Sequence, residues 1–276
     1  MTRQRQGDAD YVLGASEQER ERLRAQGDAI APMTERLLGQ AGIGPGMRVL
    51  DVGCGGGDVS ILVARLVGAE GEVVGIDRDS RMVAAARDRA RDADLSGVTF
   101  AEGDFRDLGS KHGLFDAAVG RLTLMYQADP VDAVRRVARS VRPGGVIVFQ
   151  EYDSTVRATS LVPLPLQDRV GRWIWDTFER SGADVHMGFK LYSVFTEAGL
   201  SAPEVRAEAI VLTPSTRYPT VPLVRMLLPQ MIEYGIATEQ EVDVETLERR
   251  LVAERQTAGT SYVNLLVFGA WARRPS

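Results

Sequence analysis

Short runs of consecutive apolar residues alternate along this chain with longer segments whose apolar residues recur every three or four positions. The first pattern predicts buried β-strands, and the second predicts helices that pack on a sheet. The expected strands span residues 47–52, 72–77, 98–101, 114–119, 146–151, 205–212 and 261–272. Because helical segments separate most of them, the pattern predicts an α/β fold with a doubly wound, seven-stranded, mostly parallel sheet.

Three parts of the chain do not fit this alternation. Residues 1–46 precede the first strand and contain two expected helices, which are separated near residue 27. Two further segments, about 152–189 and 214–259, interrupt the alternation and are expected to be mainly helical. We therefore expect a helical lead-in followed by one domain over 47–276, with the lead-in and both insertions forming a lid over the functional site.

The first strand runs into a glycine-rich loop, Gly53 to Gly57, which is followed by a helical pattern. Glycines let the backbone turn sharply and approach a ligand without a Cβ in the way. The start of the helix adds free N–H groups and the positive end of a dipole. A dinucleotide site would have the spacing G-x-G-x-x-G, but Asp58 occupies the place of the third glycine. Together with Asp51 it would repel a pyrophosphate and attract a cationic ligand.

Composition and charge exclude several classes of protein. The 276 residues are 44% hydrophobic and 26% charged, which is typical of a soluble globular protein. The formal net charge of −5 argues against nucleic acid or an anionic membrane as the partner. The only cysteine, Cys54, rules out an intrachain disulfide, and the polar first residues contain no secretory signal, so we expect a cytoplasmic protein. No spacing typical of metal ligands is present, so no metal is expected.

Taken together, these segments resemble the class I methyltransferases that use S-adenosylmethionine, which have a Rossmann-like fold. Within that class the chain is similar to the ubiquinone/menaquinone methyltransferase-like group that acts on small molecules. The resemblance covers residues 47–151 and rests on D-x-G-x-G-x-G at 51–57, Asp77 after the second strand, Asp104-Phe105 after the third, Phe115 to Val119, and the turn Arg142 to Gly145. It implies that the last strand of the sheet is antiparallel.

The resemblance also implies which residues bind the cofactor. It implies a site for S-adenosylmethionine formed by Asp51, Gly53, Gly55, Asp77, Arg78, Asp104, Phe105 and Arg121. Asp77 would accept both ribose hydroxyls in charge-assisted hydrogen bonds, with Arg78 beside the adenine edge. Asp104 would accept the exocyclic amine of adenine, while the backbone of Phe105 meets a ring nitrogen. Arg121 would lie near the methionine part.

Methyl transfer is an in-line displacement whose leaving group departs as a neutral thioether, so it depends mainly on proximity and orientation. A general base is needed only if the nucleophile is a hydroxyl or an acidic carbon. The candidates for that role are His186, Tyr126 and Glu151, and the candidates for contact with the substrate are Tyr11, Trp173 and His186. We expect a small, partly apolar acceptor whose methylated atom is O, N or C.

Three other functions remain open at this point. A nucleic-acid methyltransferase acting on base amines would have an N/D-P-P-Y/F/W motif after the fourth strand, where this chain has Gly120 to Thr123. A nicotinamide-dependent oxidoreductase is disfavoured by the two carboxylates at the glycine loop. A cofactor-binding sensor or scaffold without catalysis is not excluded by the sequence. The oligomeric state is expected to be a monomer or a homodimer.

Overall fold

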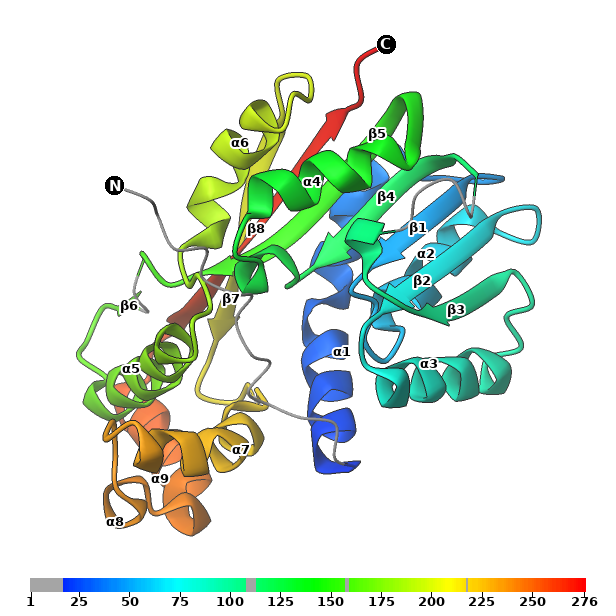
Figure 1. Ribbon diagram of the computed structural model, residues 1–276. Helices are drawn as coiled ribbons and strands as arrows, with labels where there is room; N and C mark the ends of the chain where they lie inside the picture. Colours follow the sequence, from blue (N-terminus) through cyan, green and yellow to red (C-terminus); the bar gives the residue numbers. More distant parts are fainter. Residues whose placement is uncertain (1–16, 108–112, 157–158, 217) are drawn as a thin grey trace.

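The computed structural model describes residues 17–107, 113–156, 159–216 and 218–276, with side chains described from residue 27 onward. Its eight strands are β1 Arg48–Val52, β2 Glu72–Asp77, β3 Val98–Glu102, β4 Phe115–Arg121, β5 Val141–Asp153, β6 Thr159–Ser160, β7 Glu204–Leu212 and β8 Tyr262–Arg273. They form one sheet in the order β3-β2-β1-β4-β5-β8, with β7 along the other edge of β8 and β6 beside the first residues of β8 (Figure 1).

Strands β1 to β5 are parallel, and β8 is antiparallel to both β5 and β7. The predicted fold class is therefore confirmed, including the antiparallel last strand. Only the two-residue β6 was not expected. The central strands β1, β2, β4 and β5 are runs of apolar residues that are buried between two layers of helices, which is why the apolar pattern located them, whereas β7 is largely exposed.

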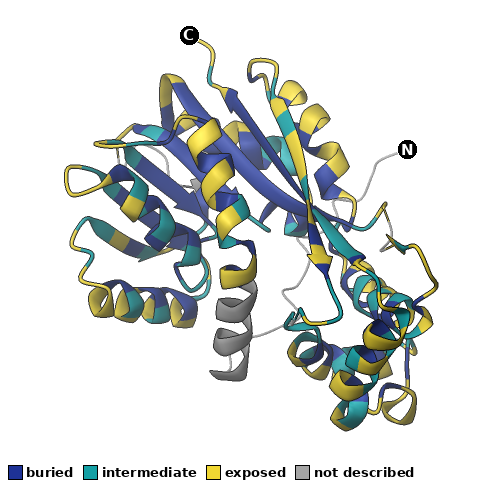
Figure 2. Cartoon of the chain, turned by 180° about the vertical axis from the view of Figure 1, so that it is seen from behind, coloured by how far each residue is buried: buried dark blue, intermediate teal, exposed yellow. Residues whose placement is uncertain are grey.

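The helices are α1 Glu17–Gln40, α2 Asp58–Val67, α3 Ser80–Asp92, α4 Pro130–Arg139, α5 Pro165–Arg180, α6 Met187–Glu197, α7 Thr220–Glu233, α8 Glu239–Val242 and α9 Val244–Ala258, with 3-10 turns η1 Phe105–Asp107 and η2 Leu124–Tyr126. Helices α1, α2 and α3 cover one face of the sheet, and α4 and α6 cover the other. Figure 2 shows the central strands as buried and the outer surfaces of the covering helices as exposed.

Helices α5, α7 and α9 pack on one another beyond the carboxyl end of β5 (Figure 1). They come from the two segments that the sequence marked as helical insertions. The lead-in differs from the expectation, because its described part is the single helix α1 rather than two helices. Gly27, where a break was expected, lies inside α1 and faces the carboxylate of Asp58, so the glycine serves close packing between helices instead of a chain break.

Helix α1 packs closely on the sheet at Gly269 of β8. A Cβ on Gly269 would lie 2.5 Å from both δ-methyl carbons of the buried Leu37. The absence of a side chain at this position therefore allows the first helix to pack directly on the last strand. The same face of the sheet holds Val49, Val148 and Trp271, which form a continuous apolar cluster with α1 and α2.

The carboxyl end of β5 holds the turn η2 in place. Glu151 is fully buried, and its Oε1 accepts hydrogen bonds from the backbone N–H groups of Thr123 (2.9 Å) and Leu124 (2.7 Å). These N–H groups begin a helical turn and have no partner within it. Burial raises the pKa of Glu151 from its ordinary value of 4.5 to about 7. Glu151 is therefore a structural anchor between β5 and the segment after β4.

Replacing Gly269 by alanine should lower the free energy of unfolding by about 1–3 kcal/mol, because the new Cβ overlaps Leu37 in a packed interface. Chemical denaturation of the purified variant measures this. Gly39→Ala is the matched control, since Gly39 lies in α1, the helix that contains Leu37, and an added Cβ there would have nothing within 4 Å. The control should be neutral or more stable by up to about 1 kcal/mol. Equal stability of the two variants would contradict the close packing at β8.

Replacing Glu151 by glutamine should flatten the dependence of stability on pH between 4.5 and about 7. Between pH 4.5 and about 7 the folded state keeps a proton on Glu151 that the unfolded chain has released, so wild-type stability falls as the pH rises. The loss attributable to this group is at most roughly 3 kcal/mol. Denaturation curves at several pH values measure it, and parallel curves for the two proteins would contradict the assignment. Carboxylates with lowered pKa values, such as Asp116, titrate below this window.

Candidate active site

A cavity of about 690 Å³ opens beyond the carboxyl ends of β1, β2 and β4. Residues of the glycine loop, Asp77 and Arg121 line it together with residues of α1, α5 and α7. In the sheet, β2 and β4 flank β1, so the chain order reverses at this point. Ligands of doubly wound α/β proteins bind at such a crossover, and the volume suits an organic ligand.

The glycine loop is held in a conformation that side chains would prevent. Gly53 has a φ of 67°, and a Cβ there would lie 2.7 Å from Oγ1 of Thr123. Gly57 has a φ of 82°, and a Cβ there would lie 3.1 Å from both Ala86 and Phe100. The backbone N–H groups of Gly53 and Cys54 both donate to the carbonyl oxygen of Ile76, which ties the loop to β2. The loop therefore presents backbone rather than side chains to the cavity.

Asp77 ends β2 and lines the cavity beside this loop. One carboxylate oxygen accepts the N–H of Gly55 (2.8 Å), and the other accepts the N–H of Asp79 (2.9 Å). Each carboxylate oxygen can accept a further hydrogen bond. The side chain is thus fixed by two loops and still has acceptor capacity for a ligand.

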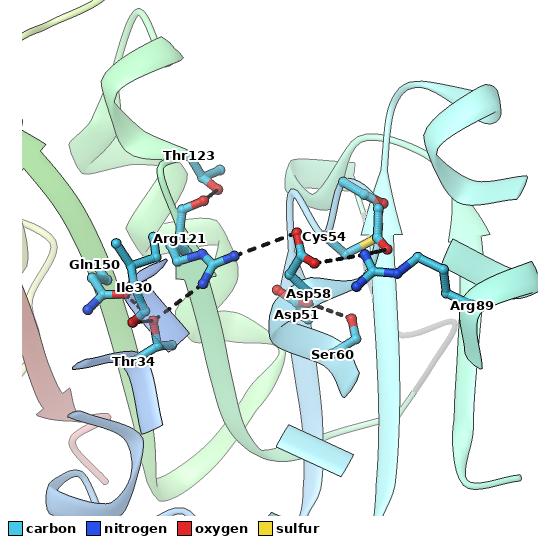
Figure 3. Close-up of polar contacts among 12 residues, drawn as sticks. Ile30, Thr34, Asp51, Cys54, Asp58, Ser60, Arg89, Arg121, Thr123 and Gln150 are labelled. Carbon is cyan, nitrogen blue, oxygen red and sulfur yellow. Dashed lines mark hydrogen bonds and ion pairs between the residues drawn. The ribbon is translucent and has the colours of Figure 1, made fainter. Parts of the chain in front are cut away.

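Two arginines surround Asp58, the first residue of α2 (Figure 3). One oxygen of Asp58 lies 2.7 Å from Nη1 of Arg89, and the other lies 3.8 Å from Nη2 of Arg121. The Nη1 atom of Arg121 donates to Thr34 of α1 (3.4 Å), and Thr34 donates in turn to Gln150 of β5 (2.7 Å). The network connects α1, α2, α3, β4 and β5 at the edge of the cavity.

This arrangement corrects the electrostatic argument made from the sequence. Asp58 lines the cavity, but its charge is balanced by Arg89 and Arg121. Asp51 does not line the cavity; it is buried behind the loop and accepts a hydrogen bond from Ser60 (2.5 Å). Burial raises the pKa of Asp51 to about 7. The two carboxylates therefore do not form the unbalanced negative surface that the sequence predicted.

The cavity brings together a large part of the residues that the sequence implicated: Gly53, Gly55, Asp77, Arg78, Phe105, Arg121, Tyr126 and His186. The other implicated residues do not line it: Asp51, Asp104, Glu151 and Trp173. The carboxylate of Asp104 is paired with the guanidinium of its near neighbour Arg106, and Trp173 is packed in the core. Tyr11 lies outside the described residues.

His186 and Tyr126 differ in their surroundings. His186 is exposed at the start of α6, and its Nδ1 lies 2.8 Å from Oγ1 of Thr155, which orients the ring. Tyr126 is the last residue of η2 and is therefore held by the turn that Glu151 anchors. Both could exchange a proton with a ligand in the cavity. Glu151 does not line the cavity, and its carboxylate accepts hydrogen bonds from the backbone at η2.

The sequence analysis selected Trp173 for contact with the substrate, but the aromatic wall of the cavity is formed by other residues. Tyr152 of β5 meets Trp175 of α5 edge to face, with ring centroids 6.3 Å apart, and Trp175 lies 6.2 Å from Phe178. All three residues line the cavity. Positions 173 and 175 are about 200° apart on a helix, so only one of these tryptophans can face the cavity. Identifying the inward one required knowledge of what α5 packs against.

Among the described residues, no helix is long and apolar enough to cross a bilayer. The same residues contain no group of three or more His, Cys, Asp or Glu side chains arranged to hold a metal ion.

Comparison with known proteins identifies relatives that match part of this chain. The ubiquinone/menaquinone biosynthesis C-methyltransferase UbiE of Idiomarina loihiensis is 35% identical over 120 residues, which are 43% of this chain and 48% of that protein. The 2-phytyl-1,4-naphtoquinone methyltransferase of Synechococcus elongatus is 34% identical over 134 residues, 42% of this chain and 58% of that protein. The chain thus spans about half the length of the curated relatives it matches.

Solved structures share the fold over most of the chain. The YcgJ protein of Bacillus subtilis superposes with a TM-score of 0.58 at 16% identity, covering 89% of this chain and 99% of that one. Phosphoethanolamine N-methyltransferase 2 of Haemonchus contortus, solved with phosphomonomethylethanolamine and S-adenosylhomocysteine, superposes with a TM-score of 0.55 at 18% identity, covering 89% and 53%. At these identities the likeness concerns the fold alone.

The family whose members are described as "Methyltransferase domain" matches residues 43–199, more than half of the sequence. This span includes the glycine loop, Asp77, Arg121 and η2, which are the parts that form the sheet side of the cavity. The chain belongs to this family of methyltransferase domains.

Proposed function

We propose that this chain transfers a methyl group from S-adenosylmethionine to a small-molecule acceptor. The observation that carries the proposal is the fixed carboxylate of Asp77 beside the glycine loop, at one end of a cavity whose other end is aromatic. Family membership and the relatives that methylate quinone precursors by name support the reaction type. A cavity of about 690 Å³ has room for a nucleoside and part of a second molecule.

The residues that would bind the cofactor follow from the cavity wall. Asp77 would accept the ribose hydroxyls, Arg78 and Phe105 would border the adenine, and Arg121 would meet the carboxylate of the methionine part. The side chain of Arg121 is only 10% exposed and pairs with Asp58 at a long distance, 3.8 Å, so it can still bind an anion. Asp51 and Asp104 would act behind these residues, because neither lines the cavity.

The bound cofactor would supply an electrophilic methyl group on a sulfonium. The chain would then have to hold the acceptor in line and exclude water, which Tyr152, Trp175 and Phe178 could do from the aromatic wall. Tyr126 and His186 remain candidates for accepting a proton from the acceptor. Glu151 would position η2 rather than react, because both backbone N–H groups that it binds belong to that turn.

We also propose that the lead-in helix α1 and the helices α5 and α7 serve as a lid, since residues of all three border the cavity or the segments leading into it. The single buried cysteine and the net negative charge favour a cytoplasmic enzyme that works as a monomer or homodimer on a small molecule, not on nucleic acid or a membrane surface.

Replacing Asp77 by alanine should weaken the binding of S-adenosylhomocysteine at least tenfold, or about 1.4 kcal/mol, by removing the partner of the ribose hydroxyls. Isothermal titration calorimetry measures the affinity. In wild type, a 2′-deoxy analogue should bind more weakly than the ribose compound, whereas in the variant the two should bind alike. This difference separates loss of the ribose contact from a general disturbance of the glycine loop.

Asp88→Ala is the matched control for Asp77→Ala, because Asp88 lies on the exposed side of α3 and pairs with Arg91. It should bind S-adenosylhomocysteine like wild type. NAD should bind neither to wild type nor to Asp88→Ala. A diphosphate would need the N-terminus of α2, and the Asp58 carboxylate lies at that position. Displacement of S-adenosylhomocysteine by NAD would contradict the proposal, and binding without turnover of any acceptor would favour a sensor.

A further inference from the structure

Gly171 lies in the interior of α5, where the backbone does not require a glycine. Glycine is the least favourable residue after proline at such a position. It is usually retained for a left-handed backbone or for close packing against another element. Neither reason applies here, because the φ of Gly171 is not positive and a Cβ on it would meet nothing described within 4 Å beyond its chain neighbours and its own helix backbone. The added Cβ would enter open space.

The open space at Gly171 is the cavity, which this residue lines. Successive residues of a helix are turned by about 100°, so the cavity-lining residues of α5 can be placed around its axis. Gly171 falls at the centre of their side, between Phe178 and Trp175. The residues on the other side of the helix do not line the cavity: Leu166, Arg169, Trp173, Thr177 and Arg180. A side chain at position 171 would therefore project into the cavity.

The missing side chain leaves a gap in the aromatic wall, which we call the α5 notch. Along the helix it is bounded by Gln167 one turn before Gly171 and by Trp175 one turn after it. The ring of Trp175 packs on Tyr152 and Phe178, with centroid distances of 6.3 and 6.2 Å. None of these rings comes within 4 Å of a Cβ on Gly171, so the aromatic residues border the α5 notch without filling it.

The helix around the α5 notch is fixed by its neighbours. Glu254 of α9 accepts hydrogen bonds from the backbone N–H groups of Leu166 (2.8 Å) and Gln167 (2.9 Å). The side chain of Gln167 donates to the carbonyl oxygen of Leu251 (3.1 Å). The first turn of α5 is thus held on α9, while Trp175 holds the middle of the helix against β5. In a fixed apolar pocket a single methylene group changes discrimination by roughly tenfold or more, so such a wall can select by size.

We propose that Gly171 determines the size of the methyl acceptor, because the α5 notch receives the apolar body of that molecule. This inference rests on the function proposed above and adds the residue that sets the size limit and the class of acceptor: an apolar molecule broader than a single ring. The body lies on the bare backbone of α5 against Trp175, with the reacting end directed toward the glycine loop.

The role of Gly171 is specificity and not chemistry. The residue offers only backbone that is already bonded within the helix, so it neither moves a proton nor contacts the transferred methyl group. The helix loses stability through the glycine and gains room for the acceptor. Substitution at this position should therefore change helix stability and acceptor binding in opposite directions.

The test fills the α5 notch in steps and compares a one-ring probe, phenol, with a two-ring probe, 2-naphthol. Calorimetry measures their affinities for the full chain saturated with S-adenosylhomocysteine. Wild type should prefer 2-naphthol at least tenfold. Gly171→Ala should reduce this preference about threefold, and Gly171→Leu should reduce it to less than about twofold, with the affinity for phenol unchanged. Gly171→Ala should also unfold at a higher temperature than wild type, because alanine favours the helix.

Gly39→Leu is the matched control, because Gly39 is a helical glycine that also has nothing within 4 Å of an added Cβ but is exposed and does not line the cavity. It should keep the wild-type affinity for both probes, and every variant should bind S-adenosylhomocysteine like wild type. An unchanged preference in Gly171→Leu, an equal loss of both probes, weaker binding of S-adenosylhomocysteine in that variant, or no binding of 2-naphthol to wild type overturns the assignment. Failure of wild type to bind S-adenosylhomocysteine at all contradicts the proposed function itself, and the two failures are thereby distinguished.

Discussion

Asp77 accepts a hydrogen bond from the backbone of each of two loops, and the shape of the cavity depends on this pair of contacts. One bond holds the glycine loop after β1, and the other holds the turn into α3. Charge-assisted bonds of this kind are stronger than neutral ones, and here they need no large side chain in the loops. The glycines can therefore face the cavity with bare backbone, while a negative charge stays at its edge where a ligand can use it.

The acidic side chains next to the glycine loop are either paired with arginines or buried. Asp58 is balanced by Arg89 and Arg121, and Asp51 is buried with a pKa raised to about 7. Rejection of a diphosphate, as proposed above, would depend on where the Asp58 carboxylate lies, at the first turn of α2, more than on net negative charge. The same network joins α1 to the sheet through Thr34, so the charge balance at the loop and the packing of the lead-in helix depend on the same hydrogen bonds.

The sequence predicted the sheet well because strands buried on both faces are continuous apolar runs, and such runs are visible locally. The resemblance to class I methyltransferases implicated Asp77 and Arg121, and both lie at the ends of their strands and line the cavity. Prediction from the sequence failed where the role of a residue depends on a contact with a residue that is distant in the sequence. Gly27 looked like a break but packs on Asp58, and Trp173 was chosen where Trp175 faces the cavity.

The contact between Leu37 and Gly269 joins the first described helix to the last strand. Strand β8 also lies inside the sheet, between β5 and β7, so the final stretch of the chain fills an interior position. Until residues 262–273 are in place, β5 has an open edge and α1 has no surface at β8 on which to dock. Because Leu37 and Gly269 are far apart in the sequence, their contact closes a long stretch of chain, and contacts of this kind slow folding.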